Sequence, residues 1–322
     1  MIFALRGRRF DIMKLALIGN IVRDEIETFD GKSVHSWGGA LYNIAVFQKL
    51  LKQGESLLPV TTVGYDVWDE LMEFLSNFDR IDTSALSKSR HRNNKVSLKY
   101  IDEQERTEQA KDILPPLELN LIEQALDANA ILFNFISGFE MKYEHLKKIR
   151  AEYEGTMLID VHSLMLGIDD EGIRFKKTFP EWRKWLSCFD CVQMNAVEAG
   201  LITDSEKQYD GYTDLANDLV NTGTKVVNIT LGQEGSYIAY RHDGAIESAH
   251  LEAMVTERTV DPTGCGDAYS AAFLIEYMRG KSPLSAARTA NHIAGIKSCV
   301  SGIEGLLSRE FDSALNNIME SD

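Results

Sequence analysis

The sequence contains few cysteines and no long apolar run, and each absence narrows the class of protein. The four cysteines, Cys188, Cys191, Cys265 and Cys299, form no disulfide framework, which is typical of a reducing cytosol. Cys188 and Cys191 form a Cys-x-x-Cys pair without a second pair or a Cys/His partner at zinc spacing, so we interpret both as core or helix-end thiols. No apolar stretch approaches the length of a membrane span. We therefore expect a cytoplasmic protein that does not cross a membrane.

Positive charge is scarce as well. The chain has 34 Lys and Arg residues against 49 Asp and Glu residues, which gives a net charge of -15. Such an excess of negative charge argues against binding to nucleic acid or to a membrane surface. The remaining composition, 44% hydrophobic and 26% charged, is typical of a globular protein that buries a sizeable core. Neither nucleic acid nor a membrane is therefore an expected partner.

Two common nucleotide-binding motifs and a leader are also absent. The chain has no Gly-x-x-x-x-Gly-Lys-Ser/Thr loop, and no Gly-x-Gly-x-x-Gly follows its first apolar run, which argues against a dinucleotide-dependent dehydrogenase. Residues 1–12 are basic but lack the long apolar region and the cleavage site of a signal peptide. We interpret residues 1–12 as an N-terminal extension and residues 13–322 as one α/β domain.

Apolar runs alternate with helical patterns along most of the chain. This alternation predicts a mostly parallel central sheet with helices on both faces, which binds ligands at the carboxyl ends of its strands. Two ribbons, near residues 25–37 and 95–110, interrupt the alternation, with turn signals at Asp30-Gly31 and Asp102-Glu103. They predict a small β-sheet that covers the site as a lid. The main strands are expected near residues 15–20, 59–64, 131–136, 157–161, 191–195 and 225–231.

The most informative stretch lies late in the chain. Val260 is followed by Asp-Pro-Thr-Gly-Cys-Gly-Asp and then by an apolar helix that ends at Gly280. The amides and the dipole at a helix N-terminus favour an anion such as phosphate, and Gly264 and Gly266 have no side chain to block its approach. Asp267 stands where the anion would arrive, so it is a candidate general base for phosphoryl transfer. The alternative is that Asp267 is only a first-turn residue of the helix.

This string resembles the signature of the ribokinase-like (PfkB) kinases, whose usual form is Asp-Thr-x-Gly-Ala-Gly-Asp, with Cys265 in place of the alanine. The order of the other motifs is similar too, and the resemblance covers roughly residues 15–310. It implies a ribokinase-like α/β fold, with a β-sheet lid, for a kinase domain spanning residues 13–322. The matching segments are Gly19 to Asp24, Gly38 to Asn43, Val63 to Asp66, Asn195 to Glu198, Thr230 to Gly235, and Ala290 to Ala294.

The resemblance also implies a role for each of these positions. Asp267 would be the general base, and Gly264, Cys265 and Gly266 would form an anion hole. By the same resemblance, Asp24, Gly38, Gly39 and Asn43 would bind the substrate, Thr230, Gly232, Gly235 and Asn291 would line the nucleotide site, and Asn195 and Glu198 would organise the water around Mg²⁺.

The expected reaction is ATP-dependent phosphorylation of a hydroxymethyl group on a sugar or sugar-like compound. The resemblance implies ATP and Mg²⁺ as cofactors, with a monovalent cation as a further candidate, and a homodimer through the lid is a candidate assembly. A nucleoside kinase with the same chemistry and a non-catalytic nucleotide- or sugar-binding regulator are open alternatives. Kinases that act on ribose have small residues where this chain has Leu41 and Tyr42, which either bring bulk near the substrate or face the core. Trp37 and Tyr100 are candidates for stacking on a base or sugar, or equally for hydrophobic closure of the lid.

Overall fold

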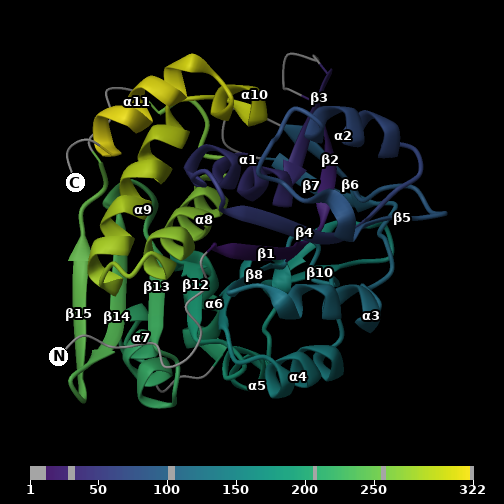
Figure 1. Cartoon of the computed structure of the whole chain (residues 1–322). Helices are drawn as coiled ribbons and strands as arrows, with labels where there is room; N and C mark the ends of the chain where they lie inside the picture. The colour runs from purple at the N-terminus through teal and green to yellow at the C-terminus, as the bar shows by residue number, and fades with distance from the viewer. Residues whose placement is uncertain (1–11, 28–32, 101–105, 206–208, 255–258, 320–322) are drawn as a thin grey trace.

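A computed structural model describes residues 12–27, 33–100, 106–205, 209–254 and 259–319 of the chain. The described elements form a large central sheet between two layers of helices, and a small sheet that projects from one side (Figure 1). Within these residues, no helix is long and apolar enough to span a membrane.

The central sheet is mostly parallel, as the alternation predicts. Its strand order is β15-β14-β13-β12-β9-β8-β1-β4-β5, and only the edge strands β14 (Ser236–His242) and β15 (Ala245–Leu251) run antiparallel to their neighbours. The middle strands are apolar and buried, the pattern expected of a parallel sheet covered on both faces. The parallel strands are β1 (Lys14–Gly19), β4 (Ser56–Val63), β5 (Leu86–Lys88), β8 (Ala130–Asn134), β9 (Thr156–Asp160), β12 (Cys191–Asn195) and β13 (Val226–Thr230).

Two hydrophobic cores lie on opposite faces of this sheet, each formed with its own set of helices. One core contains residues of α1 (Ala40–Leu50), α2 (Trp68–Leu75), α8 (Cys265–Met278), α9 (Pro283–Ser298), α10 (Gly302–Leu306) and α11 (Arg309–Met319). The other contains residues of α3 (Leu119–Ile122), α4 (Tyr143–Glu152), α5 (Trp182–Leu186), α6 (Ala196–Ser205) and α7 (Tyr212–Asn221).

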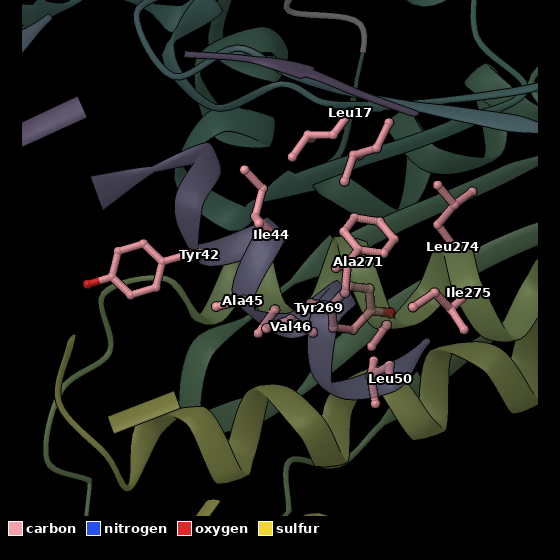
Figure 2. Packing of buried hydrophobic residues seen from close by; sticks show 14 of the residues in the cluster. Leu17, Tyr42, Ile44, Ala45, Val46, Leu50, Tyr269, Ala271, Leu274 and Ile275 are labelled. Atoms are coloured by element: carbon pink, nitrogen blue, oxygen red, sulfur yellow. The ribbon is translucent and has the colours of Figure 1, made fainter. Parts of the chain in front are cut away.

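Helices α1 and α8 pack side by side over the middle of the sheet (Figure 2). Small residues such as Ala45 and Ala271 sit among Leu17 of β1, Ile44 and Leu274, and let the two backbones approach closely. Residues 267–276 of α8 are all buried, so this helix is enclosed almost all round. The helix ends where predicted, because the residue at 280 is a glycine with φ of 90°. The N-terminus of α8 is therefore held in a fixed position.

The small sheet confirms the prediction that the two ribbons form one sheet apart from the central one. Its order is β3-β2-β6-β7, in which two antiparallel pairs are joined by the parallel pair of β2 and β6. The predicted turns at Asp30-Gly31 and Asp102-Glu103 lie outside the described residues. The four strands are β2 (Ile21–Glu27), β3 (Ser33–Gly39), β6 (Lys95–Tyr100) and β7 (Arg106–Lys111).

A short antiparallel pair, β10 (Leu166–Ile168) and β11 (Arg174–Lys176), was not predicted from the sequence. The loop between these strands lies against the edge of the small sheet, since the amide of Ala110 donates to the carbonyl oxygen of Gly172 (2.8 Å). Cys188 and Cys191 are free thiols, both buried, with no disulfide between them.

Candidate active site

Polar side chains end the apolar strands at one edge of the sheet. Strand register aligns Asn134 of β8 with Asp160 of β9, Asp160 with Gln193 of β12, and Asn195 with Thr230 of β13. These five residues are at or near the carboxyl ends of four parallel strands, where α/β proteins bind their ligands. The N-terminus of α8 lies over this edge, because Nε2 of Gln193 bridges Oδ2 of Asp160 and the carbonyl oxygen of Gly266 (3.1 Å each).

Gly264 is the residue from which α8 begins. Its φ of 80° and ψ of 2° are left-handed, and a Cβ built on it would lie 2.4 Å from Cδ1 of Tyr42. Glycine is required here both by the backbone conformation and by the aromatic ring packed against it. Gly266 differs, because the nearest atom to an added Cβ would be Nε2 of Gln193 at 3.8 Å. The start of α8 is therefore closely packed at Gly264, whereas Gly266 has space beside it.

Asp267 is held by two asparagines from other elements. Nδ2 of Asn134 donates to Oδ1 of Asp267 (2.5 Å), and Nδ2 of Asn43 in α1 donates to its carbonyl oxygen (2.9 Å). The asparagines also contact each other, since Nδ2 of Asn134 donates to Oδ1 of Asn43 (2.7 Å). Asn43 is fully buried and also donates to Oγ of Ser270 (3.2 Å). Its contacts are with the backbone of Asp267, with Asn134 and with Ser270, rather than with an open surface.

Burial dominates the electrostatics of this edge. It raises the pKa of Asp267 to about 6, against the hydrogen bond from Asn134 and the positive charge of Lys297. It also raises the pKa of Glu198 to about 7, again against hydrogen bonds from Asn195. Burial and the charges on Glu198 and Asp267 hold the pKa of Asp160 well above its usual range. All three carboxyl groups therefore bind a proton more readily than exposed carboxyl groups do.

Asn195 and Glu198 cap the start of α6. The side chain of Glu198 accepts from the amide nitrogen (2.8 Å) and from Nδ2 (2.7 Å) of Asn195, and Oδ1 of Asn195 accepts from the amide of Glu198 (2.9 Å). This is a reciprocal helix cap. Over the described part of the chain, no three His, Cys, Asp or Glu side chains gather into a metal-binding cluster.

A cavity of about 620 Å³ opens beside the N-terminus of α8. It is lined by Thr230 at the end of β13 and Asn291 in α9, together with Met254. Asn291 also donates to the carbonyl oxygens of Leu251 and Glu252 (3.2 Å each), so its amide holds the end of β15 against the cavity wall. All four residues expected at the nucleotide site line this cavity, along with one from the end of β12 and two from the first turn of α8: Thr230, Gly232, Gly235, Asn291, Asn195, Cys265 and Gly266.

The residues expected at the acceptor lie outside this list of lining residues, on β2, β3 and α1. The carboxylate of Asp24 packs on Gly38, where an added Cβ would lie 2.2 Å from Oδ2 of Asp24. Gly39 has a φ of 63°, and its Cβ would meet the carbonyl oxygen of Asn20 at 2.5 Å. Burial raises the pKa of Tyr42, and the charges of Asp261, Asp24 and Asp267 add to the effect. The ring of Tyr42 therefore packs against Gly264, at the end of the loop that precedes α8.

These observations agree with one known family. The model of the pfkB family of carbohydrate kinases matches residues 13–306, nearly the whole domain. This chain belongs to the pfkB family. It is a kinase, so the alternative of a non-catalytic regulator is set aside.

Relatives within the family include kinases of nucleosides and of sugars. The cytidine kinase of Thermococcus kodakarensis is 26% identical over 84% of this chain and 90% of the relative. The nucleoside kinase of Methanocaldococcus jannaschii is 27% identical over 82% of this chain and 80% of the relative. Among solved structures, the ribokinase of Thermotoga maritima superposes with a TM-score of 0.74 at 18% identity, covering 96% of this chain and 100% of that one. These matches confirm the ribokinase-like fold.

The aromatic and bulky residues of the sequence analysis do not form an open stacking surface. Leu41 and Tyr42 are buried in the core. Trp37 is also buried, and the guanidinium of Arg23 lies 4.5 Å from its ring centroid. The side chain of Tyr100 lies outside the described residues. The bulk at positions 41 and 42 therefore fills the core of this pfkB-family protein and packs the loop before α8.

Four residues in or beside the site were missed from the sequence. Asn134, Asp160 and Gln193 each interrupt an otherwise apolar strand near its carboxyl end, and that interruption is a signal that sequence reasoning could have used. Lys297 gave no such signal, because a lysine within a mixed helix is ordinary in sequence. Only the fold places it beneath the loop before α8.

Proposed function

We propose that this pfkB-family kinase transfers the γ-phosphoryl group of ATP to a hydroxymethyl group of a sugar or sugar-like molecule. One observation supports this above all: the buried carboxylate of Asp267 stands at the N-terminus of α8, beside a cavity of about 620 Å³ lined by residues from four separate motifs. A helix cap alone needs neither the burial nor the two supporting asparagines.

In this proposal the attacking hydroxyl oxygen bonds to the γ-phosphorus while the bond from phosphorus to the ADP oxygen breaks. The hydroxyl proton passes to a carboxylate oxygen of Asp267, whose other partner is Asn134. The amides of Gly264 and Gly266, with the positive end of the helix dipole, offset the charge that develops on the transferred group. No Walker lysine is needed for this arrangement.

The residues present fit a nucleotide with Mg²⁺. Within the described residues, Oδ1 of Asn134 and Oε1 of Gln193 are buried without a hydrogen-bond partner, which leaves two acceptors for a hydrated cation or a ligand hydroxyl. When bound, Mg²⁺ neutralises charge on the phosphates, and it keeps most of its own water. Glu198 and Asn195 would hold that water, while Thr230, Gly232, Gly235 and Asn291 would line the nucleotide site.

On the acceptor side, Asp24 would bind substrate hydroxyls over Gly38 and Gly39. Asn43 contributes indirectly, because its own hydrogen bonds are taken by Asp267, Asn134 and Ser270. We assign it the positioning of the base. The small sheet would cover the acceptor and exclude water, which would otherwise compete for the phosphoryl group.

A nucleoside is the second candidate acceptor. The two curated relatives that align with more than four fifths of this chain, at 84% and 82%, are a cytidine kinase and a nucleoside kinase. The 5′-hydroxymethyl group of a nucleoside offers the same chemistry as that of a free sugar, so the catalytic assignment is unchanged.

The test is release of ADP from MgATP with a panel of sugars and nucleosides, using the wild-type protein and Asp267→Asn side by side. The expected result is acceptor-dependent release that falls by about 10²–10⁴-fold in kcat in the variant, because asparagine keeps the shape but cannot accept the proton. Binding of ATP should survive in the variant, since the loop and the helix end remain. Near wild-type turnover with thermal destabilisation would instead support the helix-cap interpretation.

A further inference from the structure

Lys297 in α9 is a completely buried lysine that the proposed reaction does not use. Its exposed fraction is 0%, although a charged group is rarely buried unless it is paired. Its Nζ donates to the carbonyl oxygens of Asp261 and Val300 (3.1 Å each) and lies 3.6 Å from Oδ2 of Asp261. The partners are two carbonyl oxygens and one carboxylate, all of them acceptors. This is the set of ligands that a small cation prefers.

The ammonium group lies at the base of the loop that leads into α8. Asp261 begins this loop and fixes it further, because its carboxylate accepts from the amides of Thr263 (2.9 Å) and Gly302 (3.1 Å). The amide of Asp261 in turn donates to the carbonyl oxygen of Ser298 (3.1 Å). Lys297 therefore neutralises the carboxylate of Asp261 and donates to the carbonyl oxygens of Asp261 and Val300. These contacts join the loop to the end of α9.

The same ammonium group is coupled to the site in two ways. It lies 5.6 Å from the ring centroid of Tyr42, and that ring also packs against Gly264, the residue from which α8 begins. Its charge also reaches the site, since it lowers the pKa of Asp267 and opposes the rise in the pKa of Cys265. Loss of the ammonium would remove the one charged partner of the half-buried Asp261 carboxylate among the described contacts and would loosen the loop that carries Gly264.

We propose that the Lys297 ammonium is a built-in cation that holds the 261–264 loop in its phosphate-binding conformation, so that this kinase needs no free monovalent cation there. Lys297 is a positioning residue, and the inference rests on the proposed function of the loop. A tethered cation is always present at its site, whereas a dissolved ion must be recruited from solution. The monovalent cation implied by the family resemblance is thus replaced, in this chain, by its own side chain.

The first test uses the wild-type protein alone. Turnover and MgATP affinity are measured at equal ionic strength with K⁺, Na⁺ or tetramethylammonium as the only monovalent cation. Both quantities should agree within about twofold across the three salts, since a twofold change is only about 0.4 kcal/mol. Activation by K⁺ well beyond that range would overturn the proposal. Nucleotide binding with no turnover on any acceptor would count against the acceptor assignment alone, and the affinities in the three salts would still decide the role of Lys297.

The second test removes the ammonium. Lys297→Ala in tetramethylammonium should lose roughly 100-fold in kcat/KM, the cost of a misplaced site, and added ammonium or K⁺ should restore much of it. Lys297→Met keeps the bulk of the stem and should not be rescued. Lys281→Ala is the matched control, because Lys281 pairs with the buried Glu276 (3.1 Å) away from the loop, and its turnover should show no salt response. A folded Lys297→Ala protein with normal turnover in tetramethylammonium, or a loss that no cation restores, would overturn the proposal.

Discussion

The pKa of a single carboxyl group sets the expected pH dependence. Burial raises the pKa of Asp267 to about 6, whereas the role of general base proposed for it requires no such shift. Asp267 must be ionised to accept a proton, so kcat/KM should fall about tenfold for each pH unit below that value. A second variant is needed to assign this pH dependence to Asp267, because burial also raises the pKa of the neighbouring Glu198 to about 7.

Asn134→Ala distinguishes the titration of Asp267 from that of Glu198. It removes the hydrogen bond that lowers the pKa of Asp267, so the acid limb of kcat/KM should move to higher pH. The measurement is the pH profile of kcat/KM for both proteins, with thermal melting at each pH as the folding control. An unchanged limb in a folded variant would assign the titration to Glu198 instead.

The acceptor assignment rests on Asp24. Asp24→Ala should weaken acceptor binding by about 1.5–3 kcal/mol, roughly 10- to 150-fold, because buried hydroxyls lose a charged partner. KM for ATP should change far less. Gly38→Ala is a matched variant, since an added Cβ would lie 2.2 Å from Oδ2 of Asp24 and would displace the carboxylate while keeping its charge. Equal effects on the two KM values would contradict the role given to Asp24.

At the scale of the element, the two glycines at the start of α8 should respond differently to substitution. Gly264→Ala places a Cβ 2.4 Å from the ring of Tyr42 at a φ of 80°, and should cost about 1–3 kcal/mol of stability. Gly266→Ala meets no atom closer than 3.8 Å and should melt near the wild-type temperature, yet lower ATP affinity about tenfold or more, or about 1.4 kcal/mol, by crowding the phosphate site. Melting curves and nucleotide titrations of both variants provide the check. A stable Gly266→Ala protein with full affinity would mean that no phosphate approaches that amide.

Sequence could predict the elements whose signal is local. The apolar run of β1 and the helix from Cys265 to Gly280 were predicted because burial on both faces, or all round, leaves continuous apolar residues. The three-residue strands β5, β10 and β11 were not predicted, because they are defined by their partners rather than by their own pattern. The turn signals correctly indicated the two ribbons, but the parallel pairing of β2 with β6 follows only from the assembled fold.

The residues of the candidate site also fall into those with a local sequence signal and those without one. Asp267 and Gly264 belong to one contiguous motif, so their importance was visible in sequence. Asn134 reaches Asp267 across 133 residues of chain, and Lys297 reaches Asp261 across 36. No periodicity encodes contacts of that separation. Their roles therefore emerge only when the sheet edge and the end of α9 meet the loop.

At the scale of the whole molecule, the described residues form two large hydrophobic cores and one small one. The core of the small sheet consists of Val22, Val96 and Ile136, with Leu98 packed against it, whereas each face of the central sheet buries dozens of apolar side chains. Because local opening is easiest where few apolar contacts oppose it, the small sheet should open more readily than the central sheet. Such a difference suits a cover that must admit and release an acceptor.

Hydrogen exchange measures this difference directly. Amides of β2 and β6 should exchange faster than those of β1 and β8 in the free protein, and should slow when nucleotide and acceptor are both bound. If the small sheet instead forms the contact of a homodimer, their protection should rise with protein concentration before any ligand is added, and sedimentation should show the dimer. Protection of β2 and β6 that equals that of β1 in the free protein, at every concentration, would contradict a mobile cover. In that case the sheet would be a rigid wall, and acceptors would have to enter by another path.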